Sequence, residues 1–376
     1  MAPSNHPISL HEHFLLITDP RLERKKDHLL VEILLLAVLA MLCGAEHFTD
    51  FEDFGKAKEA WLRTFLRLPG GIPSHDTFGR VFSLIDPGQF AECFRAWSDG
   101  LRRAVSQEIV ALDGKTLRRS HDRFAGKKAI HVVSAWAREN GLVLGQIKVE
   151  DKSNEITAIP ELLRVLELSG CIVTIDAMGT QKAIATEICN ADAGYVLALK
   201  GNHEKVHEEV RDFLLDARGR GFAGVAHDFH ETVEKDHGRI ETRRYWITGE
   251  IDWFEDRGKW EGLRSVGMVE RIREIGGEAT REVAFHLCSI AADARTYARA
   301  ARGHWAIENA LHWSLDVTFG EDQSRVRAGH AAENLNILRH ISLNLRKRDT
   351  TKKRGIKGKQ KNAGWDHAYL LSLLKF

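Results

Sequence analysis

The sequence predicts an α/β protein with an all-α N-terminal region, a mixed central sheet and a β-rich insertion before the last helices. Three observations carry this prediction. Apolar residues recur at helical spacing through the first hundred or so residues. From residue 108, short apolar strands and amphipathic helices follow one another, beginning with a hairpin. Strand-like segments then interrupt this order until helical spacing returns at Asp293.

Residues 9 to about 104 are predicted to be helical. The longest apolar run, Ile33 to Cys43, is shorter than the roughly 20 residues that span a membrane, so residues 29–42 are predicted to form a buried helix. Residues 48–66 form a second helix. Ser74 is placed to cap a helix that ends at Ile85, and Asp86 followed by Pro87 begins the next. The last two helices fit a helix-turn-helix or a small helical bundle.

The central sheet is predicted from short segments in a fixed order. These are strands 108–112, 130–137 and 142–149, helix 157–168, strand 171–175, helix 181–189 and strand 195–199. Asn140-Gly141 favours a hairpin between the second and third strands. A hairpin followed by right-handed crossovers produces a mixed sheet.

The insertion is predicted to hold a charged helix and antiparallel strands. The helix covers 202–216, and the strands lie near 233 and at 240–247, 264–275 and 278–290. Helices return from 293 to 345, with a break near 319–320. The predicted segments are therefore 1–104 (helical, for DNA binding or dimerisation), 105–200 (first part of the core), 201–292 (insertion), 293–345 (last core helices) and 346–376 (basic tail).

Composition excludes several classes of protein. Hydrophobic residues make up 43% and charged residues 28% of the 376, which is typical of a soluble globular chain and not of a disordered one. The cysteines have no CxxC pair, so reduced thiols in a cytoplasm are expected. The five are Cys43, Cys93, Cys171, Cys189 and Cys288.

The formal net charge is only +1, which by itself argues against a nucleic-acid partner. Charge is nevertheless segregated: residues 346–362 hold nine Lys or Arg against Asp349 alone. We expect this stretch to be a flexible tail that adds salt-dependent phosphate binding.

Two predicted strands each end in an aspartate, Asp113 and Asp176. A carboxylate does not belong at the end of an apolar strand unless something offsets its desolvation. Neighbouring strands would bring both to one edge of the sheet, where open sheets build sites. The structural alternative is that each aspartate caps the next turn.

A third carboxylate would complete a site for two Mg²⁺ ions, which prefer oxygen ligands. Glu308 is the best candidate, because Trp305, Glu308 and His312 share one helical face in HWAIENALHW. The alternative for Glu308 is a half-buried partner of an arginine. Glu321 and Asp322 are the fallback ligands.

Four motifs in order resemble the DDE transposases of bacterial insertion sequences, most closely the H-repeat-associated (ISAs) group. They are LDGKT near 113, TIDAMGTQK near 176, YVLALKGNH near 200 and HWAIENALHWSLDVTFGED near 308. The resemblance implies an RNase H-like core in which Asp113, Asp176 and Glu308 bind Mg²⁺, with Mn²⁺ as a substitute. It implies a transposase that cleaves and transfers DNA strands at its element's ends.

The resemblance also implies double-stranded DNA as partner, a homodimer that pairs two ends, no membrane, and a cytoplasmic, nucleoid-associated location. Related transposases often carry Tyr, Arg and Lys around the glutamate, where this chain has Ala301, His304 and Leu315. The basic residue that contacts the end phosphate therefore stays open. The candidate DNA contacts are Lys115, Arg118, Arg119, Lys200, Arg302, His304 and Trp305.

Two other functions compete with this reading. A domesticated or inactive relative would bind DNA without cutting it. HEKVH, from His203 to His207, fits the HExxH pattern of zinc peptidases, with Glu231 or Glu234 as third ligand. Its helix is heavily charged, however, and 19 histidines make a chance match plausible. Trp246, Trp253 and Trp260 could stack an unpaired base, although core packing is the simpler reading.

Overall fold

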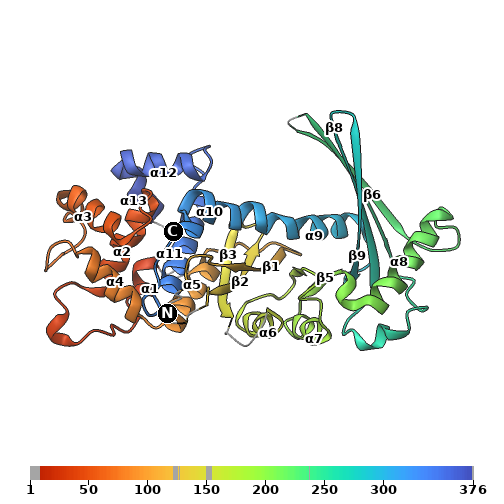
Figure 1. The fold of residues 1–376 in the computed structure, drawn as a ribbon, viewed down its shortest axis with the longest axis horizontal. Coiled ribbons are helices and arrows are strands. Elements are labelled where there is room, and N and C mark those ends of the chain that lie inside the picture. Colours follow the sequence, from red (N-terminus) through yellow and green to blue (C-terminus); the bar gives the residue numbers. More distant parts are fainter. Residues whose placement is uncertain (1–8, 122–125, 127, 150–154, 237, 375–376) are drawn as a thin grey trace, which may run out of the picture.

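A mixed sheet of nine strands runs through the middle of the computed structural model, which describes residues 9–121, 126, 128–149, 155–236 and 238–374 (Figure 1). The strand order is β3-β2-β1-β4-β5-β9-β8-β7-β6. The strands are β1 (Ile109–Thr116), β2 (His131–Ala137), β3 (Leu142–Val149), β4 (Ile172–Ile175), β5 (Gly194–Leu199), β6 (Asp228–Asp236), β7 (Arg239–Thr248), β8 (Ser265–Ile275) and β9 (Glu278–Cys288).

The first five strands confirm the predicted RNase H-like core. β1 pairs antiparallel with β2 and parallel with β4, and β4 pairs parallel with β5. One detail of the prediction is wrong: Asp113 does not end its strand, because β1 continues to Thr116. It continues because β2 pairs with β1 as far as Thr116 and His131, whereas β4 already stops at Ile175.

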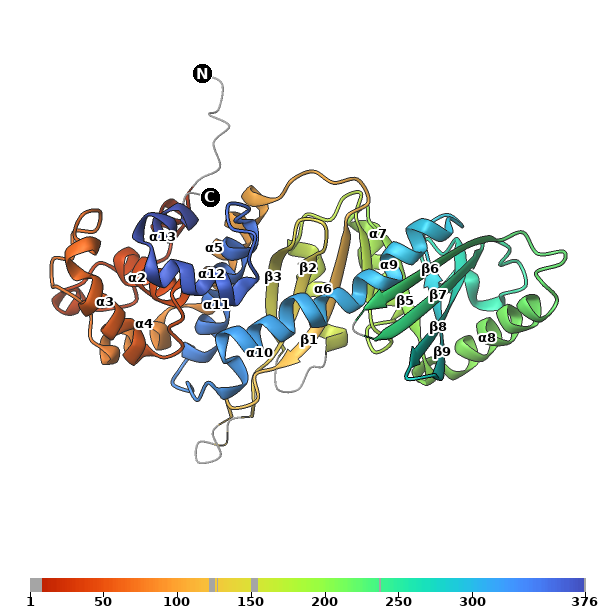
Figure 2. The same ribbon diagram turned by 90° about the horizontal axis from the view of Figure 1, so that it is seen from above.

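Helices cover both faces of this core (Figure 2). α9 (Ala294–Ile307) crosses β1 and β4 on one face, while α6 (Glu155–Val165) and α7 (Lys182–Asn190) lie on the other. α9 continues through a π-helical turn, Glu308–His312, into α10 (Trp313–Phe319). The predicted break follows at Gly320, which takes the left-handed conformation with φ 60°.

The insertion extends the sheet and does not form a sheet of its own. β9 pairs antiparallel with β5, so β6 to β9 follow the core strands edge to edge. Gly276-Gly277 forms the turn between β8 and β9, with Ile275 paired to Glu278 and both glycines at positive φ. α8 (Glu204–Gly219) packs against β8 and β9.

The other end of the molecule is a helical lobe. It is made from both ends of the chain. Its N-terminal helices are α1 (Leu10–Phe14), α2 (Leu30–Leu42), α3 (Phe48–Leu62), α4 (His75–Leu84) and α5 (Pro87–Leu101). The predicted caps are confirmed, since Ser74 Oγ accepts from Thr77 N and Asp86 Oδ1 from Gln89 N. α11 (Ala331–Arg348) contacts α2, α4 and α5, which makes this lobe a helical bundle.

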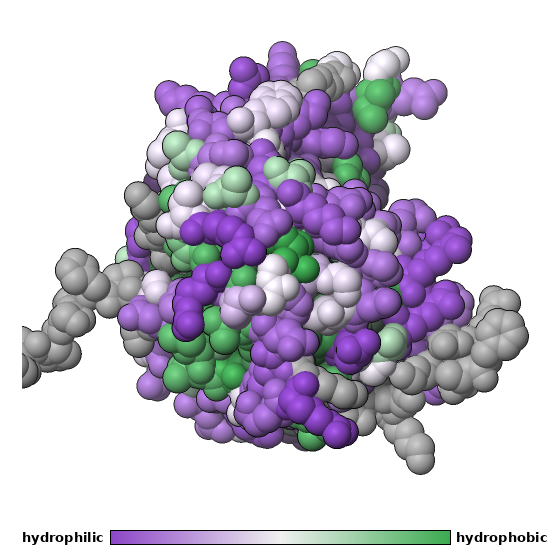
Figure 3. Space-filling view, turned by 90° about the vertical axis from the view of Figure 1, so that its left-hand side faces the viewer, coloured by the Kyte–Doolittle hydropathy of each residue, from purple (hydrophilic) through white to green (hydrophobic). Residues whose placement is uncertain are grey.

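α2 is buried along almost its whole length, as its apolar run predicts. Throughout the part of the chain that the structure describes, no helix combines the length and hydropathy of a membrane span. Figure 3 looks onto the helical end, where hydrophilic side chains cover most of the surface and hydrophobic ones form smaller patches. All five cysteines are free thiols, as expected.

The prediction of a flexible basic tail is wrong. The chain from 346 onward ends α11 and forms α12 (Ile356–Trp365) and α13 (His367–Leu373), which lie on the helical lobe (Figure 1). Arg346 is fully buried and donates to the carbonyl of Met41 at 2.6 Å. Lys359 is also buried and donates to the carbonyl of Arg346 at 2.9 Å. Burial lowers the pKa of Arg346 to about 9.

Candidate active site

Asp113 and Asp176 lie next to each other across two parallel strands. The pairing of β1 with β4 ends at Leu112 and Ile175, and each aspartate is the next residue of its strand or loop. Asp113 Oδ1 accepts from the N–H of Gly114 at 2.9 Å. Asp176 Oδ1 accepts from the N–H groups of Met178 and Gly179 at 3.1 and 3.2 Å. Asp176 therefore caps a turn with one of its two oxygens while standing beside Asp113.

Glu308 reaches this edge of the sheet from the π-helical turn that follows α9. Helix α9 approaches β1 closely at Gly303, where an added Cβ would lie 2.6 Å from Ile109 Cγ2. Glu308 is the first residue of the π-helical turn, and its side chain is exposed. Single π turns inside α-helices are rare and concentrate at functional sites. One turn later, His312 Nδ1 stands 3.5 Å from Asp113 Oδ2.

The charges of the other two predicted carboxylates act on Asp113. Burial, reinforced by the negative charges of Glu155, Asp176 and Glu308, raises the pKa of Asp113 to about 7. Burial lowers the pKa of His312 to about 4 and also lowers that of His304. Both rings are therefore neutral near pH 7, and the site holds a surplus of negative charge.

Glu155 is a fourth carboxylate that sequence reasoning missed. It begins α6, and its Oε1 lies 2.7 Å from Nε2 of His131 at the start of β2. His131 Nδ1 lies 2.9 Å from Thr116 Oγ1. An acidic residue in the first turn of a helix is common, because it interacts favourably with the helix dipole. Nothing in the local pattern therefore separated Glu155 from an ordinary helix start.

The residues at this edge suit a divalent cation by their chemistry. Asp113, Asp176, Glu308 and Glu155 offer only carboxylate oxygens, the donors that hard ions such as Mg²⁺ prefer. Burial raises the pKa of Asp113 most, and the negative charges of the other three carboxylates add to the rise, an effect that a cation would offset. In the described parts of the chain, no three His, Cys, Asp or Glu side chains are already close enough together to hold a metal ion. A metal ion held by these carboxylates would therefore require their side chains to move.

Two of the predicted DNA contacts are held in ion pairs within the chain. Lys115 Nζ binds Asp316 and, at 2.7 Å, Glu321. Arg302 binds Glu234 of β6 with both terminal nitrogens, one of them at 2.7 Å. A phosphate contact is less expected for Lys115 and Arg302, because carboxylates of the chain already neutralise the positive charge of each side chain.

The other predicted contacts lie closer to solvent. Arg118 is 78% exposed and pairs with Asp322 at 3.2 Å, and Lys200 is exposed. Arg119 is half-buried, and its carbonyl accepts from Arg327. His304 is near Asp176 and bonds the Thr174 backbone, so as a neutral ring it contributes no positive charge. Trp305 is 56% exposed, with the Arg271 guanidinium 5.6 Å from its ring centre.

The fallback ligands have other partners. Glu321 is buried, and although burial opposes its ionisation, Arg339 and Lys115 lower its pKa to about 2. It also accepts from Asn336 at 2.7 Å. Asp322 pairs with Arg118. Glu321 is therefore the centre of a buried ionic cluster that joins β1 to α11.

The zinc-peptidase reading finds no support in the geometry. α8 begins at Glu204, so His203 precedes the helix, and its Nε2 bonds the carbonyl of Thr180. His207 packs edge-on against Phe285. Glu231 and Glu234 pair with Arg244 and Arg302. His203 thus joins the insertion to the core, and His207 packs within the insertion.

The three insertion tryptophans mainly pack within the protein. Trp260 and Trp246 are buried, and Trp253 stacks on Phe213 with ring centres 4.2 Å apart. The core-packing reading is therefore the better description of all three.

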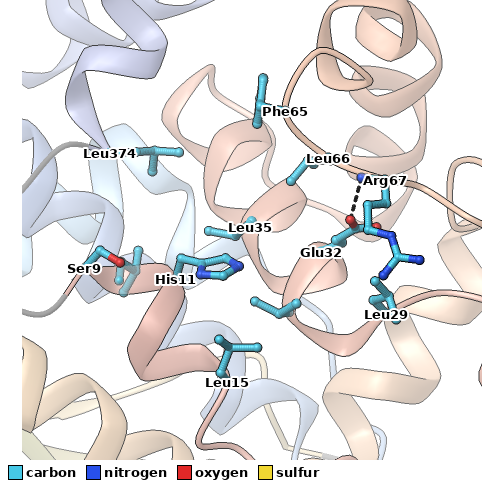
Figure 4. Close-up of a pocket in the computed structure, with 12 residues that line it drawn as sticks. Ser9, His11, Leu15, Leu29, Glu32, Leu35, Phe65, Leu66, Arg67 and Leu374 are labelled. Carbon is cyan, nitrogen blue, oxygen red and sulfur yellow. Dashed lines mark hydrogen bonds between the residues drawn. The ribbon is translucent and has the colours of Figure 1, made fainter.

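A cavity of about 460 Å³ opens in the helical lobe, away from the carboxylates. Leu10, Leu35, Leu66 and Leu374 are among its lining residues (Figure 4). On one side, Glu32 Oε1 accepts from the N–H of Arg67 at 2.6 Å. This bond fixes the loop after α3 against α2, so the polar groups of the cavity wall serve the fold.

Comparison with known proteins finds matches over nearly the whole chain. The family described as Transposase DDE domain matches residues 105–345, and one described as DDE_Tnp_1-associated matches residues 11–98. YbfL of Escherichia coli K12 is 40% identical over 371 residues, covering 97% of each chain. A second K12 protein, YhhI, named as a candidate H repeat-associated transposase, is 39% identical with the same coverage. The solved piggyBac transposase synaptic complex with hairpin DNA has a TM-score of 0.45 at 10% identity, covering 99% of this chain and 78% of that one.

The fold and the carboxylate edge define an RNase H-like protein of the class that works with divalent metal ions. More particularly, the chain belongs to the DDE transposase family, and its relatives over nearly its full length include an H repeat-associated member.

Proposed function

We propose that this transposase cuts DNA at the ends of its own insertion sequence and joins the freed 3′ end to target DNA, in a reaction that depends on Mg²⁺. One observation carries the proposal. Asp113, Asp176 and Glu308 come from β1, the end of β4 and the π turn after α9, and the charges of the other two act on Asp113.

The roles of the residues follow from their positions. Asp113, Asp176 and Glu308 would hold the metal ions. When bound, two such ions activate the attacking oxygen and stabilise the leaving oxygen of the phosphodiester. His304 and His312 border the carboxylates and are neutral near pH 7. They can therefore offer hydrogen bonds without adding positive charge that would oppose the binding of a cation. Their lowered pKa values keep the site anionic until metal enters.

DNA is proposed to approach over the exposed rim of this edge. Lys200 and Arg118 carry exposed positive charge there, and Arg119 lies beside Arg118 in the basic stretch of residues 114–128, which holds six Lys or Arg against Asp122 alone. Trp305, three residues before Glu308, presents an exposed ring that can stack on a base. Some of the basic stretch, including Arg123 and Lys127, lies outside the described residues. We further propose that two copies act together to pair two element ends.

The proposal is tested with labelled element ends and purified full-length protein. The wild type is expected to nick one strand at the terminus in Mg²⁺ and in Mn²⁺. Asp113→Ala and Glu308→Gln are expected to bind the same DNA and to lose at least a hundredfold in nicking rate, since each removes a proposed metal ligand. Glu161→Gln, an exposed carboxylate change on α6, is the matched control and should nick at the wild-type rate.

Each contrary outcome has a definite meaning. Wild-type protein that binds the ends but never nicks them would identify an inactive DNA-binding relative. Undiminished nicking by Asp113→Ala would refute the assignment of the site. Cleavage of casein that depends on zinc would revive the peptidase reading.

A further inference from the structure

Glu155 approaches the active-site strand more closely than any side chain at Gly114 would allow. A Cβ built on Gly114 would lie 2.1 Å from Glu155 Oε1 and 2.5 Å from His131 Nε2. Gly114 directly follows Asp113 inside β1, where glycine weakens a strand and commonly marks a close approach. The absent side chain makes room for the carboxylate of Glu155 beside the catalytic strand.

The position of Glu155 is fixed by a chain of polar contacts. His131 Nε2 donates to Glu155 Oε1 at 2.7 Å, and the other ring nitrogen, Nδ1, faces Thr116 Oγ1 at 2.9 Å. Thr116 and His131 are also paired directly across β1 and β2. The side chains of Thr116 in β1 and His131 in β2 therefore orient the carboxylate of Glu155, which lies at the start of α6.

We propose that Glu155, positioned by His131, is a fourth carboxylate of the metal site. This inference rests on the proposed function, since it concerns the same metal-dependent site. Asp113 and Lys115 point toward the α10 side of β1, while Gly114 faces α6. Glu155 thus brings its charge to Asp113 from the side that α9 and α10 do not occupy.

Electrostatics supports this placement. Of the three carboxylates that act on Asp113, Glu155 has the largest effect, ahead of Asp176 and Glu308. Four carboxylates held at one edge repel one another, and a divalent cation offsets that repulsion. If Glu155 only interacted favourably with the helix dipole in the first turn of α6, its replacement would leave metal affinity unchanged.

The experiment measures metal binding directly, apart from DNA cleavage. Full-length wild type, Asp113→Asn, Glu155→Gln and Glu161→Gln are titrated with Mn²⁺ by calorimetry, and thermal unfolding is followed in EDTA and in Mn²⁺. Glu155→Gln keeps a hydrogen-bond acceptor for His131 but loses the charge. It is expected to weaken Mn²⁺ affinity about tenfold. It should also unfold at an equal or higher temperature than wild type in EDTA, because like charges no longer repel. Glu161→Gln should match wild type in both.

A second variant guards against an indirect effect of the substitution. Gly114→Ala leaves every carboxylate in place but displaces Glu155, so it should lower Mn²⁺ affinity to a similar degree. If Asp113→Asn loses Mn²⁺ binding while Glu155→Gln stays within twofold of wild type, the role of Glu155 is refuted and the proposed function stands. If the wild type binds no Mn²⁺, both proposals fail.

Discussion

At the scale of single residues, Asp113 is held in a state that favours protonation in the metal-free protein. Its pKa of about 7 in the folded chain lies above the ordinary value of 3.8, because burial and neighbouring carboxylates disfavour its charge. A carboxyl with a raised pKa stabilises the fold most below its ordinary pKa. That contribution is lost as the pH rises toward 7. The metal-free site therefore costs stability at neutral and alkaline pH.

This pH dependence of stability predicts the behaviour of the Asp113→Asn variant. In EDTA at pH 8, Asp113→Asn should unfold at a temperature about 2–5 °C above that of wild type, since the variant carries no charge there. At pH 4, where the wild-type carboxyl is protonated, the two melting temperatures should converge. Thermal unfolding across this pH range measures the difference. A gap that widened toward low pH would contradict the assigned direction.

Residues also show where sequence reasoning succeeds and fails. That Asp113 and Asp176 are neighbours could be predicted, because a carboxylate directly after an apolar segment is unusual in one short window of sequence. The place of Glu155 could not, because an acid at a helix start is ordinary and its contact with Gly114 exists only in three dimensions. Lys115 was assigned to DNA because its carboxylate partners, Asp316 and Glu321, lie about two hundred residues away.

At the scale of elements, a buried ionic cluster fastens the active-site strand to the helical lobe. Lys115 of β1 pairs with Glu321, and Glu321 in turn meets Arg339 of α11 at 3.4 Å. The side chains of Glu321 and Arg339 are almost fully buried. Removing one member of such a cluster leaves another buried without full compensation, which costs far more than breaking an exposed pair. Lys115 therefore has a structural role two residues from Asp113, the proposed metal ligand.

Lys115→Met should accordingly lower the free energy of unfolding by about 3 kcal/mol. Arg118→Met is the matched control, because Arg118 pairs with Asp322 at the surface, and its loss should cost less than about 1 kcal/mol. Chemical denaturation measures both. If Lys115→Met kept wild-type stability and lost DNA affinity, Lys115 would be a DNA contact as the sequence first indicated.

Element pairing marks the limit of what local patterns predict. The order of the five core strands followed from a hairpin and two crossovers, each read within about thirty residues. The union of β5 with β9 could not be read in this way, since Val196 pairs with Cys288 across some ninety positions. The π turn at Glu308 was equally hidden, because the sequence there is compatible with an uninterrupted α-helix.

At the scale of the whole molecule, charge is distributed unevenly around a near-neutral total. Basic residues of 346–362 offset the acidic remainder, and six of these nine fall into a buried and an exposed group in the structure. Arg346 and Lys359 are buried and bind backbone carbonyls. Lys353, Arg354, Lys357 and Lys361 are exposed. Lysine-rich composition alone suggested disorder, but Ala363, Tyr369, Leu370 and Leu373 bury apolar surface against the lobe and hold the segment in place.

The last prediction separates these two groups of basic residues. Changing the four exposed residues to glutamine should leave thermal stability unchanged and should flatten the salt dependence of DNA binding by about 0.9 for each phosphate that is no longer neutralised. Lys359→Gln is the opposing control: it replaces the buried ammonium that donates to the carbonyl of Arg346 with a shorter, neutral side chain, so it should lower the melting temperature. Because Lys359 is shielded from DNA, its replacement should leave the salt slope as in wild type.

Affinity for element ends, measured by fluorescence anisotropy from low to moderate salt, gives the slopes. An unchanged slope in the fourfold variant would show that this basic surface does not bind phosphate. DNA binding would then depend on the rim around Asp113, Asp176 and Glu308, since the basic residues there are the other proposed contacts.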